Sequence, residues 1–195
     1  MEILSSFKSL SLKVKISPMK SAFVLITTTF CSLCYHGYAQ AVDTLFLNAA
    51  YAKLQTSAEY TLKVAYLMPA DKYDSRPSPG QMSFGQQLIH LSRNLGWLSG
   101  YYLNNGEENP VTEADLKLQQ KDSIIAVVDR TYGQALAILK RFSPDQLTDT
   151  VSFFAGPMNK LRIINLLNDH QTHHRGQLVV YLRMNGIKPP PYVGW

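Results

Sequence analysis

The sequence is poor in cysteine: its 195 residues contain two, Cys31 and Cys34, and both lie within the first 41 residues. A long hydrophobic run is also missing, because the apolar stretch that opens at Ala22 is soon interrupted by threonines and serine. A helix that spans a bilayer needs about 20 consecutive apolar residues. The stretch therefore does not predict a stable membrane anchor. Neither cysteine follows a small residue, which argues against a lipid anchor.

Several chemistry-bearing patterns are absent as well. No glycine-rich loop follows an expected strand, so the sequence does not predict a nucleotide-binding site. No order of Ser, His and Asp indicates acyl transfer. Internal repeats and low-complexity tracts are also missing, so the chain does not belong to the repeat or disordered classes.

The first 41 residues have the three parts of a secretory signal peptide. An apolar segment follows a basic one, and Ala39-Gln40-Ala41 is a small-x-small cleavage site. We therefore expect residues 1–41 to be a signal peptide, with Met19 as an alternative start, and the mature chain to be exported to the periplasm or the extracellular space. Four lysines form the basic region: Lys8, Lys13, Lys15 and Lys20.

Removal of this segment changes the composition. The mature chain from Val42 onward would have no cysteine, and so no disulfide, thiolate nucleophile or zinc–thiolate site. The formal charge of the whole chain is +5, but loss of the four lysines and Glu2 leaves 15 basic and 13 acidic residues, a charge of +2. A nucleic-acid role needs a clustered basic face. The mature chain does not predict one, and we expect no nucleic-acid partner.

Residues 42–195 have the size of one ordinary domain, and their apolar spacing predicts four long helices. We expect these over residues 43–68, 83–102, 112–141 and 159–185, with a short extended segment within residues 148–158. Helices with one apolar face and connections of this length favour a four-helix bundle, an all-α fold whose interior can hold metal ions between facing helices.

The last expected helix carries three histidines, His170, His173 and His174. Residues four apart lie on the same helical face, so His170 and His174 are expected to point into the core, while His173 is turned about 100° away. A zinc-protease helix would need a glutamate after the first histidine. Gln171 stands there, so that class is disfavoured. The alternative is that the pair are ordinary core histidines.

His90 lies on the second expected helix, beside its leucine stripe and on one face with Asn94, Trp97 and Tyr101. In a bundle this face can approach the histidines of the last helix. Three neutral imidazoles match the three-ligand arrangement of catalytic zinc, which leaves one coordination position open. Imidazole also suits nickel, copper and iron, so spacing alone does not fix the metal.

His90, the run from His170 to Leu178 and the continuation to Pro189 resemble the DinB-like family, which includes DinB-type damage-inducible proteins and related metal-dependent thiol transferases. The likeness covers residues 42–195. It implies an up-down-down-up four-helix bundle, a homodimer, and a divalent metal ion, with zinc or nickel favoured. The ligands that it implies are His90, His170 and His174.

The sequence is compatible with three functions. The first is a metal-dependent enzyme, of transferase or hydrolase type, acting on a small molecule. Asp169, His173 and Arg175 are its candidate catalytic or outer-shell residues, with Arg175 for an anionic substrate group, and Asn94 and Tyr101 face the expected site. The second is a non-catalytic metal-binding or stress-related bundle or dimerisation module, and the third is a structural or partner-binding bundle without metal.

Overall fold

The computed structural model describes residues 18–193, and side chains over residues 40–193. Contacts divide the chain into two compact units, Met1–Ala41 and Val42–Trp195. The basic residues Lys8, Lys13 and Lys15 of the expected signal peptide lie outside the described residues. Within the part of the chain that the structure describes, no helix is long and apolar enough to cross a membrane. Cleavage and export stay predictions.

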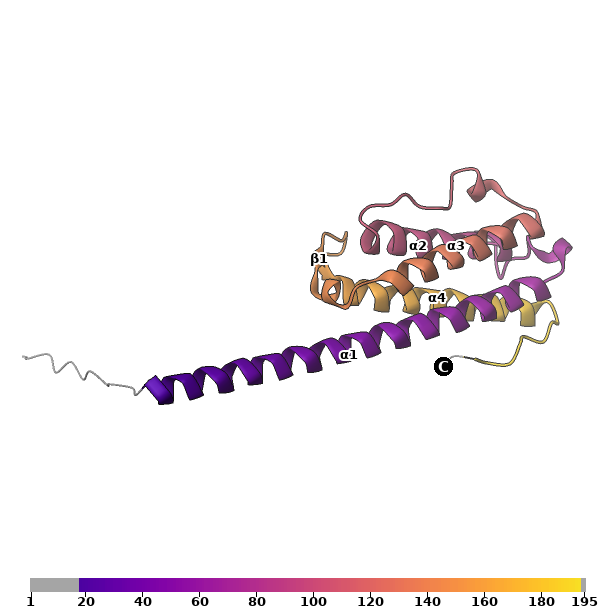
Figure 1. Cartoon of the computed structure of the whole chain (residues 1–195). Helices are drawn as coiled ribbons and strands as arrows, with labels where there is room; N and C mark the ends of the chain where they lie inside the picture. Colours follow the sequence, from indigo (N-terminus) through magenta and orange to yellow (C-terminus); the bar gives the residue numbers. More distant parts are fainter. Residues whose placement is uncertain (1–17, 194–195) are drawn as a thin grey trace, which may run out of the picture. The chain divides into compact units, whose positions relative to one another are not determined.

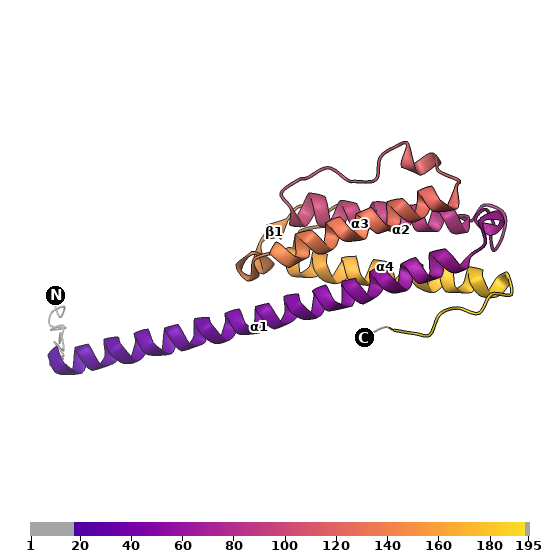
Figure 2. The ribbon, with the colours of Figure 1, turned by 45° about the vertical axis from the view of Figure 1, so that its right-hand side comes forward.

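The second unit is a helical bundle. It comprises the C-terminal part of α1 (Pro18–Leu67), α2 (Phe84–Gly96), α3 (Lys121–Arg141) and α4 (Lys160–Met184). Figures 1 and 2 show α2 and α3 side by side and running in the same direction, because the connection between them crosses back along the bundle. The helix α4 runs the opposite way, as does the part of α1 in this unit. The expected up-down-down-up bundle is confirmed.

Two helix starts and one helix end follow from local capping. The Ser83 hydroxyl accepts from the backbone N–H of Gln86, whose side chain accepts in turn from the Ser83 N–H, so a capping box begins α2. Asn159 caps α4 by accepting from Arg162. Gly186, at φ 73°, ends α4 in a left-handed turn closed by two backbone bonds. These boundaries agree with the sequence prediction.

The predicted start of the third helix, near Thr112, is wrong, because α3 begins at Lys121. The backbone N–H and hydroxyl of Thr112 both donate to one carboxylate oxygen of Asp115, 2.8 and 2.9 Å away, and so form a turn that leads into a single 3₁₀ turn, η3 (Asp115–Lys117). Leu118 then returns to extended backbone at φ −65° and ψ 137°. The prediction failed because the apolar residues keep a helical spacing before Lys121, although the polar residues of that segment favour a turn.

The second predicted helix is also not one regular α-helix. After Gly96 it continues as a π-helix, η2 (Trp97–Leu103). The returning connection packs against its backbone: a Cβ atom at Gly96 would lie 2.7 Å from the Cδ atom of Pro110. Asn109 donates from its side chain to the carbonyl of Arg93 at 2.8 Å. Glycine at 96 therefore lets the connection lie close to the helix that carries His90.

The segment between α3 and α4 forms a small hairpin. A 3₁₀ turn, η4 (Pro144–Thr148), opens it, and β1 (Thr150–Val151) pairs antiparallel with β2 (Met158–Asn159). The prediction of a short extended segment here is confirmed in part, since the residues between the two strands form a turn. In Figure 1 the hairpin lies at the end of the bundle where α3 ends and α4 begins.

The core of the bundle is aliphatic and aromatic, and its burial is the main stabilising term, at about 2 kcal/mol for each fully buried leucine. The predicted apolar face of the first helix is largely buried, but Leu45 and Tyr66 are exposed. A few polar side chains, among them Thr61 and Gln171, are fully enclosed in this core. The largest fully buried side chains include Tyr132, Phe84, Leu54, Met68, Leu88, Leu91, Leu95 and Leu98.

Candidate metal centre

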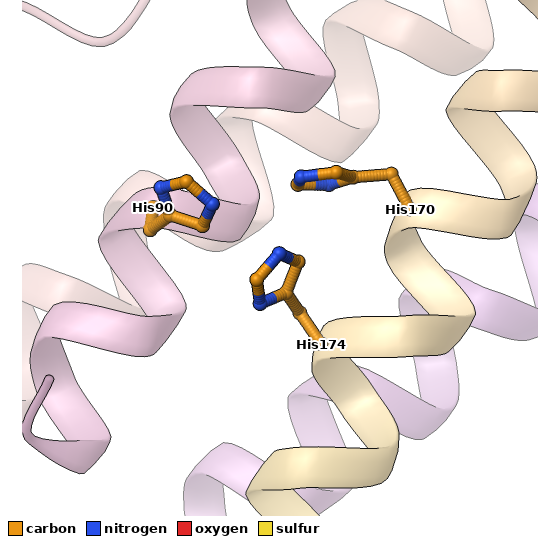
Figure 3. A group of neighbouring side chains, drawn as sticks. All are labelled: His90, His170 and His174. Atoms are coloured by element: carbon orange, nitrogen blue, oxygen red, sulfur yellow. The ribbon is translucent and has the colours of Figure 1, made fainter. Parts of the chain in front are cut away.

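Three histidines from two helices meet at the seam between α2 and α4. His90 extends from α2, and His170 and His174 extend from successive turns of α4, so that the three rings converge (Figure 3). One nitrogen from each residue lies within 4.8 Å of the others. The ring centroid of His174 lies 4.5 Å from that of His90 and 4.3 Å from that of His170. The structure thus brings together the three residues that the sequence selected as metal ligands.

The histidines lie at the edge of the core rather than in its centre. None of the three side chains is exposed, but none is fully buried either. The helical-spacing prediction that both imidazoles of α4 point into the core is therefore correct only in part. The polar side chain of α4 that is fully enclosed is Gln171, at 0% exposure. An edge position leaves a route by which a metal ion or a small molecule can reach the rings.

His173 lies outside the group. Its side chain is exposed, and its Nε2 atom lies 3.1 Å from the side-chain nitrogen of Gln177. Its ring packs edge-on against that of His174, with 4.9 Å between centroids. The rotation of about 100° per helical residue accounts for this position, because it turns His173 away from the seam.

Two glutamine side chains orient His174. Its Nδ1 atom lies 2.9 Å from the side-chain oxygen of Gln87 and 3.0 Å from that of Gln177. An amide oxygen only accepts hydrogen bonds, so Nδ1 carries the proton and Nε2 keeps its lone pair for a ligand. Gln87 also donates to the Gln177 oxygen at 2.7 Å, which ties α2 to α4 beside the histidines. Metal-binding histidines commonly have an outer partner of this kind.

The sequence prediction missed Gln87 as part of the site. Gln87 precedes His90 by three residues, and Gln177 follows His174 by three, so each glutamine shares a helical face with a histidine. That spacing could have indicated that both glutamines lie beside the histidines. Glutamine is a common surface residue, however, and only the approach of α2 to α4 shows that the two amides meet.

The three imidazoles are held in their neutral form. Burial, followed by the charges of the neighbouring histidines, lowers the pKa of His170 to about 4. Burial, followed by the charges of His90 and His173, lowers the pKa of His174 to about 4. The pKa of His90 is also lowered, by burial and by the positive charge of Arg93. Neutral imidazole is the form that binds metal ions, so the group is ready to act as a ligand set at pH 7.

The donor set fits a divalent transition metal. Nitrogen atoms bound to one tetrahedral ion, each about 2.1 Å from it, lie about 3.4 Å apart, so small ring rotations from the present spacing suffice. The Nδ1 atom of His170 is buried and has no hydrogen-bond partner among the described residues. Burial of an unpaired polar atom is costly. Coordination of an ion by this nitrogen would offset that cost, which supports the fit.

Two clefts border the group on the α2 side. The larger has a volume of about 550 Å³ and the smaller about 280 Å³, and His90 and Arg93 line both. Arg93 pairs with Glu113 at 3.5 Å, and both side chains are largely exposed. The larger cleft also has an apolar wall. Its lining consists of His90, Arg93, Asn94, Trp97, Asn109, Val111 and Glu113.

The two residues of α2 and η2 that were expected to face the site have different positions. Asn94 lines the larger cleft, as expected. Tyr101 does not: it is 55% exposed, packs edge-on against Tyr102, and lines a separate cavity beside the hairpin. The change to π-helix after Gly96 alters the rotation per residue, so extrapolating the α-helical face from His90 to Tyr101 fails.

Two of the predicted catalytic candidates lie away from the histidines. Asp169 is exposed and pairs with Lys53 of α1 at 3.7 Å, so it does not orient an imidazole. Arg175 is 6% exposed, donates to the Ser57 hydroxyl, and lies over the Tyr60 ring with 5.4 Å to its centroid. Both face α1. The prediction that Arg175 binds an anionic substrate group does not fit its burial on that side.

Comparison with known proteins identifies the family. The sequence profile described as the DinB family matches residues 42–194, which is most of the chain. The chain belongs to the DinB family. As a DinB-family member it is similar to the uncharacterized protein YjoA of Bacillus subtilis (strain 168), with 25% identity over 136 residues that cover 68% of this chain and 86% of YjoA.

Crystal structures show the same DinB-like fold. The DinB-like protein YjoA from Bacillus subtilis superposes with a TM-score of 0.60 at 18% identity, covering 74% of this chain and 96% of that one. A DinB-like protein from Bacillus cereus gives a TM-score of 0.59 at 21% identity, covering 76% and 95%. At these identities the likeness establishes the fold alone. The chemistry of this DinB-family chain has to be argued from its own residues.

Proposed function

We propose that this DinB-family protein is a metal-dependent enzyme that holds one divalent ion, zinc or nickel, on His90, His170 and His174. The observation that carries the proposal is the convergence of three uncharged imidazoles from two helices within 4.8 Å. Among the described residues, no further His, Cys, Asp or Glu joins this group. Such a donor set favours an open coordination position and argues against a closed, purely structural metal site.

Such an ion would supply Lewis-acid chemistry, lowering the pKa of a coordinated water or thiol toward 7. The protein's own residues prepare the site. Gln87 and Gln177 fix the proton of His174 on Nδ1, and burial keeps the pKa of His170 and His174 near 4. An ion held on these histidines would suit a transferase or a hydrolase, because both activate a nucleophile beside a bound substrate.

The larger cleft beside His90 is the proposed substrate site. A volume of about 550 Å³ suits a small molecule. Trp97 and Val111 offer apolar contact, and Arg93 is the positively charged residue of its lining. Arg93 therefore takes the anion-binding role first expected of Arg175. An exposed ion pair such as Arg93–Glu113 is worth about 0.5 kcal/mol, so a substrate anion can displace the glutamate.

We also propose that the protein is exported and forms a homodimer. The signal-like sequence of residues 1–41 supports export, and the family resemblance supports a homodimer. The near-neutral charge of residues 42–195 supports a small-molecule substrate over a nucleic acid.

The first experiment is elemental analysis of the full chain, produced without a histidine tag, beside two single substitutions. We expect close to one zinc or nickel ion per chain in the wild type, loss of that ion in His174→Ala, and its retention in His173→Ala. His173 is the matched control because it is adjacent to the site but faces away from it. A wild type that stays free of metal after incubation with either ion would refute the proposal.

A further inference from the structure

A chain of buried polar side chains runs behind the histidines. The Tyr132 hydroxyl of α3 lies 3.2 Å from the Ser57 hydroxyl and 3.1 Å from that of Thr61, both on α1. It donates to the side-chain oxygen of Gln171 on α4 at 2.9 Å. The nitrogen of the same Gln171 amide donates to the backbone carbonyl of Leu91 on α2 at 3.3 Å. One glutamine thus connects three helices.

The sequence positions of these contacts match those of the metal ligands. Gln171 follows His170 directly, and Leu91 follows His90 directly. The amide of Gln171 therefore spans α4 and α2 at the level of the histidines. A mid-helix carbonyl already accepts the N–H bond of its own helix, so a second bond from another helix is an added tie between the two backbones.

We propose that Gln171 is a positioning residue for the histidine group: its bond to Leu91 holds α2 and α4 at the separation and register that let His90, His170 and His174 share one ion. This inference rests on the proposed metal site. Gln171 does not touch the ion. It acts through the two backbones to which the histidines are attached.

The burial of Gln171 supports a positioning role over simple packing. Its side chain has 0% exposure, and at such a position an apolar residue of equal length would pack without a desolvation cost. The amide offsets that cost through two directional bonds, one to Tyr132 and one to Leu91. Tyr132 has other hydroxyl partners on α1, whereas the Gln171 amide is the side chain that bonds the Leu91 carbonyl among the described residues.

The test compares Gln171→Met with Thr61→Val in the full, untagged chain. Methionine keeps the length of the side chain and removes both bonds of Gln171. Valine removes a hydroxyl from the same buried network, but on α1, away from the tie between α2 and α4. For each variant, zinc affinity is measured by competition with a chromophoric chelator, cobalt(II) is added to record its visible absorption, and thermal stability is measured without metal.

We expect Gln171→Met to weaken zinc binding about tenfold or more, as loss of outer-shell partners does at other metal sites. We also expect it to change the cobalt absorption, because the ligand geometry relaxes. Thr61→Val should lower thermal stability while leaving affinity and absorption unchanged. If Gln171→Met does not fold, Gln171→Asn replaces it, since asparagine keeps the amide but is too short to reach Leu91.

Three outcomes would overturn the inference. If wild-type protein binds zinc and the Gln171 variants bind it equally tightly with the same cobalt spectrum, Gln171 has no positioning role, although the metal site stands. If Thr61→Val weakens zinc binding as much as Gln171→Met, the effect belongs to general core stability. If the wild type binds no metal, the proposed function fails and the positioning role fails with it.

Discussion

The two sides of α4 bury nitrogen-rich side chains in different ways. On the side that faces α1, the guanidinium of Arg175 donates to the hydroxyls of Ser57 and Thr172 and lies over the Tyr60 ring. On the side that faces α2, burial and the neighbouring histidines lower the pKa of His170, whose Nδ1 atom has no hydrogen-bond partner among the described residues. Arg175 is bonded to protein groups, whereas the histidine group has the arrangement of a ligand set for the proposed ion.

This difference separates stability from function within a single helix. A buried guanidinium that is already bonded to protein groups has little capacity left to bind a ligand, and breaking those buried bonds is destabilising. Neutral rings that face each other at an edge of the core contribute little to the fold without metal, and they are free to bind. The expected consequences can be tested by changing one side at a time.

The largest expected effect is the loss of stability on the α1 side. Arg175→Leu removes the bond to the buried Ser57 hydroxyl and the packing of the guanidinium over the Tyr60 ring, so we expect the free energy of unfolding to fall by about 3 kcal/mol. Zinc affinity should change by less than about threefold, because the histidines are untouched. Urea unfolding and chelator competition measure the two quantities.

Arg162→Leu is the control for that change. It removes an arginine from the same helix at an exposed position, where we expect a cost of less than about 0.5 kcal/mol. If Arg175→Leu abolished metal binding and left stability unchanged, the division between the two sides of α4 would be wrong.

The next effect concerns the α2 side and appears only with metal present. At a free zinc concentration one hundred times Kd, binding to the native state should add about 2.7 kcal/mol to stability. For a domain of this size that corresponds to a rise in Tm of about 8 °C. Differential scanning fluorimetry with and without zinc measures it. We expect His90→Ala to remove the rise, and His173→Ala to keep it.

The sequence predicted the bundle and the pair His170 and His174 because both depend on local periodicity, whereas His90 was added as a ligand by the resemblance to the DinB-like family. The spacing of His170 and His174 on a long apolar helix fixes their common face, and Ser83 and Gly186 mark helix boundaries through side-chain and backbone chemistry close by in the chain. Such signals act within a few residues, so they can be read without knowing how the helices pack.

The features that sequence reasoning missed depend on how distant segments pack. Arg175 was a candidate for binding an anionic substrate group, but the approach of α1 buries it. The partnership of Gln87 with His174 joins residues 87 positions apart. Gly96 shows the same limit, since only the returning connection reveals why a side chain is absent there. Spacing within one helix carries no information about these contacts.

A smaller effect is expected from the outer partner of His174. Gln87→Leu removes one of two amide oxygens that hold the Nδ1 proton, so we expect zinc affinity to fall about tenfold, the lower end of the range for such partners. Gln86→Leu is the control, because Gln86 is adjacent in sequence but belongs to the capping box of α2. It should cost about 1 kcal/mol of stability and leave zinc affinity unchanged. Equal affinities for both variants would exclude Gln87 from the site.

The smallest effect is the pH dependence of the metal-free protein. The pKa of His170 and of His174 falls from 6.5 to about 4 on folding, so between these values the unfolded chain binds protons that the folded chain does not. Stability must therefore decline as the pH is lowered from about 6.5 toward 4, and it should level off below that. The decline is modest because the rings are partly solvated, and water screens their charges. Urea unfolding across this pH range should show it in the wild type, and replacing both residues with glutamine should flatten the curve. A decline that persists in the double variant would come from His90, whose pKa is also lowered, or from groups outside the histidine site.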